Sequence, residues 1–512
     1  MTKNNKNNNS KISELRLLTT VEKIGNKLPH PAALFGIFAL ITLLISFIGY
    51  YLQWEGTNPA TGESIKIVNL ISREGLHRIL LDMVDNYTGF APLGIVMVAM
   101  LGIGIAESSG LIKAAIKLLL IKAPKNTVTF MIVLTGILSN TASDLGYILI
   151  IPLAGIIFHS LGRHPIAGMA AAFAGVSGGF SANLLIGTID PLLAGLSTEA
   201  ARIIDPEYYV MPTANYYFMA VSTFIIAATG TWLTRAVIEP RLGKYTGHVE
   251  KEEISTLSAE EKKGLKWTGV TLLFFAVLIA AGLIPGNGIL RGSDNTVLHS
   301  PVLKGFISVL FITAAACGIV FGYKSGTFKK HSDIINGMNN SFKSMISFLV
   351  LVFFAAQFVA WFKWSHLGLL IAVKGAAFLQ STNLGLIPLV IMFVLLSGFI
   401  NMFMGSASAK WAILGPVFIP MFMLLGYSPE LSQAVFRIGD SVTNVISPMM
   451  SFFALIIVYF HKYDSKAGIG TIMAVMLPYS ITFFIVWTLL MIAWILLGIP
   501  LGPEAGLYYT PH

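Results

Sequence analysis

Nine apolar runs, each of about 20 residues or more, constrain this chain more than any other feature. They lie near 31–53, 92–112, 165–186, 213–237, 267–286, 302–323, 341–362, 429–460 and 468–499. A helix of that length, at about 1.5 Å per residue, covers roughly 30 Å of hydrocarbon. Because 55% of the 512 residues are hydrophobic and only 12% are charged, a soluble core could not bury so much apolar surface. The sequence therefore predicts an all-α polytopic membrane protein with nine transmembrane helices.

Two further pairs of apolar segments are too short to cross a bilayer. The first pair, 127–138 and 148–161, flanks the polar stretch SNTASDLGY, and the second, 391–403 and 411–426, flanks FMGSASAKW. About 12 residues of helix reach only ~18 Å. We therefore interpret 127–162 and 391–426 as re-entrant helical hairpins whose polar tips are buried in protein or face water at membrane depth.

The two halves of the chain match at one constant offset in residue number, without a gap. The matched pairs are Pro152 and Pro416, Leu161 and Leu425, Gly162 and Gly426, Pro165 and Pro429, Gly175 and Gly439, and Ser177 and Ser441. Four crossings precede the charged loop 238–266, and the extra span 267–286 then reverses the direction of entry. An inverted repeat of this kind is typical of secondary transporters, whereas chance similarity between two apolar stretches is the alternative.

The distribution of Lys and Arg predicts the orientation. The segments predicted inside hold 24 of these 34 residues, those outside hold eight, and Lys410 and Arg437 fall within membrane segments. This bias accounts for the net charge of +9 without nucleic acid, and it places the N-terminus in the cytoplasm and the C-terminus outside. The expected organisation is a basic cytoplasmic tail 1–30, a first half 31–237, a charged cytoplasmic loop with linking span 238–300, a second half 301–499 and an outer tail 500–512.

A charged side chain at membrane depth is costly and needs a partner or a function. The candidates are Glu107, Asp144, Asp190, Lys410, Arg437 and Asp440. Gln433, Arg437, Asp440, Asn444 and Ser447 follow one another at helical spacing, which places them on one face of the span beginning at Pro429. Two interpretations stay open: Arg437 and Asp440 form an ion pair that locks two helices, or Arg437 or Lys410 attracts a substrate carboxylate while Asp440 binds a proton or cation.

The hairpin tips offer small polar side chains that suit a carboxylate or an oxygen-ligated Na⁺. They are Ser139, Asn140 and Thr141 in the first tip and Ser406 and Ser408 in the second. Capping of short helices is their alternative role, and also that of Asp144. Asp190 precedes a proline that interrupts its helix, so it either carries a proton or caps a helix at the outer end. We expect a structural hydrogen-bonding role for Glu107.

Other functional classes fit less well. The stretch GVSGG, 175–179, matches serine-hydrolase patterns, but the nearest histidine, His159, lies near the inner boundary, so an intramembrane protease is disfavoured. His159 and His164 have poor spacing for one metal, and the single cysteine, Cys317, excludes a disulfide within the chain. An ion channel is disfavoured because the two long copies are inverted. We therefore predict no enzyme and no cofactor.

At these residues the sequence resembles the p-aminobenzoyl-glutamate transporter (AbgT) family of the wider ion-transporter superfamily. The likeness is carried by SNTASDLGYI, GGFSANLLIGTIDPLLAGLS, and GSASAKWAILGPVFIPM continuing to FRIGDSVTNVISPMMSFF, and in length and span order it covers nearly the whole chain. The resemblance implies nine transmembrane helices and two re-entrant hairpins, assembled as a homodimer in the bacterial inner membrane.

The resemblance also implies a function and its residues. It implies transport of p-aminobenzoyl-glutamate or a related anionic antimetabolite, driven by H⁺ or Na⁺ through alternating access; a sodium-coupled dicarboxylate transporter is the alternative. Its functional positions match Asp190, Ser408, Trp411, Pro429, Arg437, Asp440 and Pro448, with Trp411 stacking on the aminobenzoyl ring. Ser139, Asn140 and Asn183 are the candidate sodium ligands, and only the first tip keeps the Ser-Asn-Thr motif of the dicarboxylate relatives.

Overall fold

The computed structural model describes residues 29–57, 64–121, 124, 126–142, 146–247, 249, 256–297, 299–447, 450, 452–465 and 467–511. Within these ranges most of the chain is helical, and one short antiparallel pair joins β1 (Glu55–Thr57) to β2 (Ser64–Lys66). Three sequence predictions lie outside the described residues: Asp144, Pro448 and all of the basic tail except Pro29 and His30.

Eight helical stretches of the described chain are long and apolar enough to cross a membrane. They are α2 (Pro31–Tyr51), α3 with α4 (Arg73–Thr88 and Ala91–Ser108), α10 with η4 and α11 (Tyr216–Leu233, Thr234–Ile238 and Glu239–Leu242), α12 (Ala259–Leu283), α14 (Phe306–Ser325), Met345–Trp364 of α15 (His331–Trp364), α18 (Ala407–Leu424) and α21 (Ile469–Leu496). Seven of them fall on predicted runs, and α18 is the second arm of the second predicted hairpin.

The two remaining runs, 165–186 and 429–460, were predicted as continuous spans, and this prediction is wrong. The first run contains α8 (Pro165–Phe173) with η3 (Ala174–Gly178) and then becomes irregular, and α9 (Ile189–Ala201) begins only beyond the run. The second divides into α19 (Pro429–Asn444) and α20 (Phe453–His461).

Local side-chain acceptors explain the first interruption. The backbone N–H groups of Leu185 and Gly187 donate to Asn183 Oδ1 (3.2 Å) and Asp190 Oδ2 (2.7 Å) rather than to helical carbonyls. Hydropathy does not register such a break because the intervening residues stay apolar. Asp190 consequently lies at the start of α9, 6% exposed.

The predicted hairpins coincide with two pairs of helices. The first pair consists of α6 (Val128–Ser139) with the short turn η1 (Asn140–Ala142), followed by η2 (Gly146–Ile150) and α7 (Ile151–Ser160). The second consists of α17 (Leu386–Asn401) and α18. α13 (Pro301–Lys304) overlaps the start of the predicted run 302–323, whereas α3, α5 (Leu111–Ile121), α9 and α16 (Leu367–Ser381) lie mainly outside the predicted runs and hairpins. They are too short to register as crossings.

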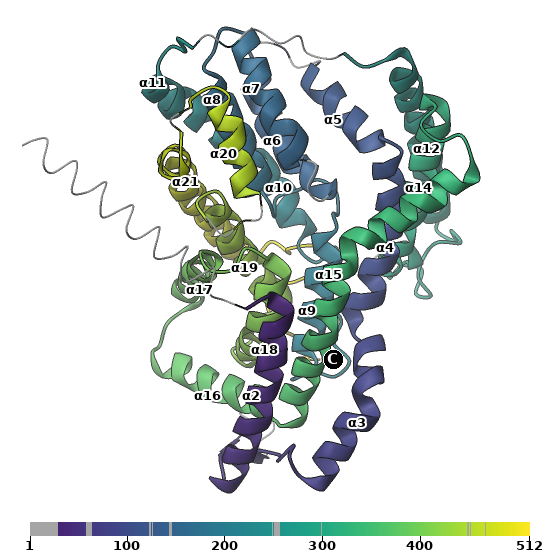
Figure 1. Ribbon diagram of the computed structural model, residues 1–512. Coiled ribbons are helices and arrows are strands. Elements are labelled where there is room, and N and C mark those ends of the chain that lie inside the picture. Colours follow the sequence, from purple (N-terminus) through teal and green to yellow (C-terminus); the bar gives the residue numbers. More distant parts are fainter. Residues whose placement is uncertain are drawn as a thin grey trace, which may run out of the picture.

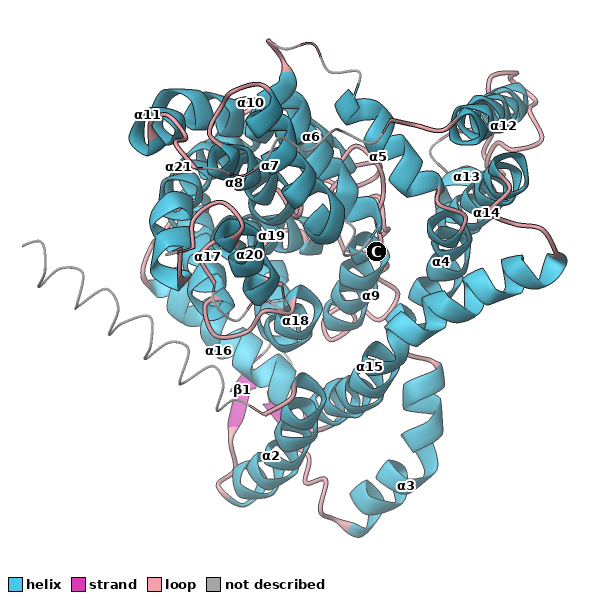
Figure 2. Ribbon diagram, turned by 45° about the horizontal axis from the view of Figure 1, so that its top comes forward, coloured by secondary structure: helices cyan, strands magenta, loops and turns pink. Residues whose placement is uncertain are grey.

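The helices gather in two groups, which Figures 1 and 2 show from two directions. One group contains α2, α4, α12, α14 and α15, with α4 packed on α14 and α15 and α12 packed on α14. The other contains the two hairpins, the interrupted helices, α10 and α21. The groups meet at α9, which packs on both α4 and α18.

Some helices bury polar side chains, whereas others expose apolar ones. On α19 every side chain except that of Thr443 is buried, although the helix carries Glu430, Gln433, Arg437 and Asp440. On α12 the large apolar side chains are exposed instead: Val270, Leu272, Leu273, Phe274, Val277 and Leu278. An exposed apolar surface of this kind suits a bilayer as solvent.

Candidate functional site

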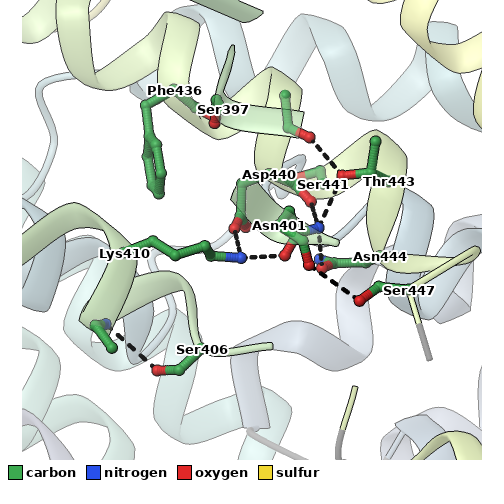
Figure 3. A network of polar contacts seen from close by, with 12 residues as sticks. Ser397, Asn401, Ser406, Lys410, Phe436, Asp440, Ser441, Thr443, Asn444 and Ser447 are labelled. Carbon is green, nitrogen blue, oxygen red and sulfur yellow. Dashed lines mark hydrogen bonds and ion pairs between the residues drawn. The ribbon is translucent and has the colours of Figure 1, made fainter. Parts of the chain in front are cut away.

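An ion pair joins α18 to α19 at the centre of the second group of helices. Lys410 Nζ lies 2.5 Å from Asp440 Oδ1, and both side chains are 1% exposed. The ammonium group also donates to Asn401 Oδ1, so Lys410 points from α18 between two partners (Figure 3). Burial of two charges is tolerated because each compensates the other.

A second ion pair joins α19 to α9, one turn away on the same helix. Arg437 Nη2 lies 2.6 Å from Asp190 Oδ1, with side chains 3% and 8% exposed. Asp190 Oδ2 accepts a hydrogen bond from the N–H of Gly187. The same carboxylate therefore pairs with the Arg437 guanidinium and stabilises the non-helical backbone before α9. The predicted pair of Arg437 with Asp440 is therefore wrong: each residue pairs with a different helix, because α9 and α18 bring opposite charges against α19.

Asn401, at the end of α17, organises the polar contacts around Asp440. Its Nδ2 lies 2.7 Å from the Asp440 carbonyl oxygen and 2.8 Å from Asn444 Oδ1. The backbone carbonyl of Asn401 accepts a hydrogen bond from Ser447 Oγ at 3.0 Å (Figure 3). Sequence reasoning missed Asn401. The available signal was an amide side chain, fully buried here, at the end of an otherwise apolar hairpin arm.

The predicted polar stripe of α19 is thus confirmed as a face turned toward protein. Arg437, Asp440 and Asn444 contact α9, α18 and α17, respectively. Gln433, one turn toward the helix start, donates to Asn215 Oδ1 (2.9 Å) and accepts from Ser197 Oγ (2.6 Å).

A cavity of about 510 Å³ lies beside the first ion pair. Its wall combines the second hairpin tip, from Phe403 to Ser408, with Asp440 and Asn444 of α19. Tyr147 and Phe452 complete it with rings stacked at 4.7 Å. The predicted substrate-binding residues Ser406, Ser408 and Asn444 therefore line one common cavity with Asp440, which was predicted to couple transport to an ion.

Trp411 lies behind this wall. It is fully buried, its ring stacks on Phe436 at 4.5 Å, and its Nε1 donates to Ser197 Oγ at 2.9 Å. Trp411 does not line the cavity, and its predicted stacking on an aminobenzoyl ring stays a prediction. Pro429 occupies the first turn of α19, where a proline needs no N–H partner.

The side chains of the first tip bond mainly within their own helix. Ser139, Asn140 and Thr141 donate to the carbonyls of Gly136, Ile137 and Leu138, and Asn183 Nδ2 donates to Thr141 Oγ1 at 3.1 Å. These hydrogen bonds satisfy backbone carbonyls in the last turn of α6, so the side chains cap the end of that helix. One acceptor is left over: Asn140 Oδ1 is buried and has no hydrogen-bond partner among the described residues. That oxygen fits a cation ligand, whereas no group of three His, Cys, Asp or Glu residues in the described part of the chain could hold a metal.

Among the residues that the structure describes, Ser177, His159 and His164 do not form a serine-hydrolase or metal site. Ser177 is fully buried against Tyr147 (3.3 Å) and Met450 Sδ (3.0 Å), and neither is a base. His159 and His164 pack edge-on against Tyr245. Burial lowers the pKa of His164, although Asp464 and Glu239 oppose the shift.

Nearly the whole chain matches known proteins of one family. Residues 16–509 match the family described as "AbgT putative transporter family". A p-aminobenzoyl-glutamate transport protein of Escherichia coli K12 is 39% identical over 494 residues, covering 96% of this chain and 97% of the relative.

Two solved structures share the fold. The Alcanivorax borkumensis YdaH transporter has a TM-score of 0.89 and 46% identity, covering 93% of this chain and 100% of its own. Neisseria gonorrhoeae MtrF, described within a class of antimetabolite efflux pumps, has a TM-score of 0.90 and 49% identity, covering 96% and 100%. These relatives are transporters rather than enzymes.

Proposed function

Because the chain belongs to the AbgT family of membrane transporters, we propose that it is a secondary active transporter of p-aminobenzoyl-glutamate or a related aromatic carboxylate or antimetabolite. The named E. coli relative and the efflux class of MtrF support this substrate range. The observation that carries the mechanism is the buried Lys410–Asp440 pair at the wall of a 510 Å³ cavity.

We propose nine crossings with two re-entrant hairpins in an inverted repeat. The starts of α8 at Pro165 and α19 at Pro429 have the same separation in the chain as the starts of α9 at Ile189 and α20 at Phe453. Corresponding contacts support the repeat: α6 packs on α8 as α17 packs on α19, and α10 packs on α6 as α21 packs on α17. Interrupted helices at equivalent places in two halves are typical of transporter sites.

The predicted domain division and orientation stay part of this proposal. The N-terminus would lie in the cytoplasm and the C-terminus outside a bacterial inner membrane, with two chains forming a homodimer as the family resemblance implies. The Lys and Arg bias of 24 inside against eight outside supports the orientation.

The substrate carboxylate would compete with Asp440 for Lys410. Ser406 and Ser408, whose hydroxyl oxygens lie 3.2 Å apart, would receive the anion at the start of α18, where the helix N-terminus favours negative charge. Asp440, once released from Lys410, would take a proton and so couple the two fluxes. Arg437 and Asp190 would undergo the same exchange one turn away.

Proton and sodium coupling are both compatible with this arrangement. Asp440 and Asp190 offer carboxylates for protons, while Asn140 Oδ1, with Ser139 and Asn183 nearby in the first tip region, offers an oxygen for Na⁺. A sodium-coupled dicarboxylate transporter is the second candidate, favoured by that unpaired oxygen. In either case alternating access would move one group of helices against the other.

Uptake of labelled p-aminobenzoyl-glutamate into proteoliposomes, with pH and sodium gradients imposed separately, tests the proposal. We expect saturable uptake driven by one gradient, and loss of gradient-driven uptake in Asp440→Asn with the protein still folded and inserted. Asp82→Asn, which changes a surface carboxylate 41% exposed, is the matched control. Wild-type uptake rates in Asp440→Asn would refute the role of Asp440, and conductance without saturation would identify a channel.

A further inference from the structure

A second cavity, of about 710 Å³, lies at the opposite end of α19 from the first. Its wall combines the segment from Glu207 to Ala214, His299 and Lys304 of the α12–α14 connection, and the C-terminal segment from Pro503 to Ala505. Glu430, in the first turn of α19, also lines it. The three loop segments all belong to the face on which the C-terminus lies in the proposed topology.

Glu430 is a buried carboxyl group without a basic partner. It is 5% exposed, and its polar side-chain neighbours are the hydroxyl of Tyr208, which donates to Oε2 at 3.0 Å, and the neutral Ser428. Among the described residues no Lys, Arg or His nitrogen lies within 4.0 Å of it. An unpaired buried carboxylate is costly, so such a group binds a proton readily.

The helix start does not require this acid. Ser428 already caps α19 by accepting the N–H of Leu431 at 3.1 Å. At the equivalent helix start of the first half, where α8 begins at Pro165, the residue matching Glu430 is the buried apolar Ile166. Stabilisation of the helix dipole by an acidic first turn is therefore dispensable in this fold.

The other charged side chains that line the second cavity either form ion pairs with one another or are exposed. His299 pairs with Asp294 and, at 3.2 Å, with Glu504. Glu207 and Lys304 are exposed at the rim.

Tyr208 separates Glu430 from a further buried carboxylate. Behind Tyr208, the hydroxyl of Tyr509 donates to Asp205 at 3.2 Å. Burial, and then the Glu430 carboxylate, raise the pKa of Tyr208, so this phenol stays a hydrogen-bond donor.

Glu430 is tied structurally to the site at the other cavity. Asn215 Nδ2 donates to the Glu430 carbonyl (2.9 Å), Gln433 donates to Asn215, and Ser197 joins Gln433 to Trp411 Nε1. Amide and indole groups in this chain fix positions and do not relay protons. Trp411 is the neighbour in sequence of Lys410, so the start of α19 and the base of the Lys410–Asp440 pair share one hydrogen-bonded framework.

We propose that Glu430 is a proton-exchange site, which takes up and releases protons through the second cavity on the C-terminal face. This inference rests on the proposed transport function. It locates, on the C-terminal face, the group that would exchange the coupling proton with the surrounding water. The charge state of Glu430 would bias the position of α19 and thereby the Lys410–Asp440 and Arg437–Asp190 pairs.

Glu430→Gln tests the proposal in proteoliposomes of known orientation. We expect substrate counterflow to be retained, because Glu430 does not line the first cavity, whereas the dependence of gradient-driven uptake on the pH of the C-terminal side flattens. Tyr208→Phe removes a donor to the ionised carboxylate and should shift the midpoint of that dependence to higher pH. Glu207→Gln, an exposed carboxylate of the same cavity, should keep the wild-type profile.

A second measurement does not depend on the substrate. The infrared band of a protonated buried carboxyl group, followed during titration of the purified full-length protein, should be diminished in Glu430→Gln and unchanged in Glu207→Gln. A wild-type pH profile in Glu430→Gln, or loss of counterflow together with gradient-driven uptake, would overturn the inference. Absence of p-aminobenzoyl-glutamate counterflow in the wild-type protein would instead overturn the proposed function and leave the infrared result to stand.

Discussion

At the scale of single residues, four buried charges form two ion pairs between helices. Lys410 pairs with Asp440 and Arg437 with Asp190, and none of the four side chains is more than 8% exposed. Removing one partner of such a pair leaves an uncompensated charge in the interior. In the proposed mechanism the same atoms would also exchange partners with the substrate, so a structural and a functional requirement would coincide there.

Replacing Lys410 alone should be much more harmful to stability than replacing the pair. We expect Lys410→Met to lower the free energy of unfolding by about 3–5 kcal/mol, because Asp440 is left buried and unpaired. The double variant Lys410→Met with Asp440→Leu should recover most of that loss, since an apolar pair needs no compensation. Unfolding in detergent, followed by tryptophan fluorescence, measures both. A double variant no more stable than the single one would contradict the ion-pair account, and neither variant should transport.

The sequence predicted that these four charges lie at membrane depth but not how they pair, and it did not single out Glu430, which is also buried. Arg437, Asp440, Asp190 and Lys410 stand out because charge at membrane depth is rare. Their partners depend on which helices pack against α19. For Arg437 and Asp190 that packing joins segments from different halves of the chain, which no local pattern reveals. Asn401 was missed because an asparagine carries no comparable penalty in sequence alone.

At the scale of elements, two glycines let the interrupted helices approach the hairpins. A Cβ at Gly175 would meet the carbonyl oxygen of Val133 in α6, and one at Gly439 would meet that of Val394 in α17. Both contacts are with backbone, which cannot move aside as a flexible side chain can. The equivalent glycines therefore allow a close approach to the first arm of a hairpin in both halves, although the two carbonyls they meet are not at equivalent positions.

Alanine at either position should destabilise the protein to a similar degree. We expect Gly175→Ala and Gly439→Ala each to cost about 1–3 kcal/mol through overpacking. Gly470→Ala is the matched control, because nothing lies within 4 Å of a Cβ there and alanine favours a helix. Thermal unfolding compares the three variants. A tolerated Gly439→Ala beside a destabilised Gly175→Ala would show that the two halves do not share this contact.

Hydropathy located the helical segments better than it located their ends. Seven of nine predicted runs contain a helix long enough to cross, because length and apolar composition are local properties. The interruption after η3 was not predicted, since the side-chain acceptors Asn183 and Asp190 occupy only two positions among mainly apolar neighbours. The interruption after α19 was not predicted either. The β1–β2 pair and α16 were also not predicted, because they are too short to give a clear hydropathy signal.

At the scale of the whole molecule, the two cavities lie at opposite ends of one buried helix. The first is lined by Asp440 and Asn444 near the end of α19, and the second by Glu430 at its start. Between them the helix is enclosed by α9, α17, α18 and α21. In the proposed topology the two cavities therefore open toward opposite sides of the membrane.

Chemical labelling can check this arrangement directly. The single native cysteine, Cys317, is 4% exposed and should stay unreactive. A cysteine replacing Ser408 should react with a membrane-impermeant maleimide from the N-terminal side, with protection by substrate. A cysteine replacing Glu207 should react from the other side. Reaction of both from the same side would contradict the orientation.

The two ion pairs carry a consequence for stoichiometry. Their fixed charges cancel, so the empty pocket is neutral, and a low-dielectric interior resists any departure from neutrality. Under the proposed mechanism, a substrate with two ionised carboxylates would enter only with two accompanying cations, one for each displaced aspartate. A singly charged drug would need one. The number of ions moved per turnover, and hence whether transport generates a current, would then follow the valence of the cargo.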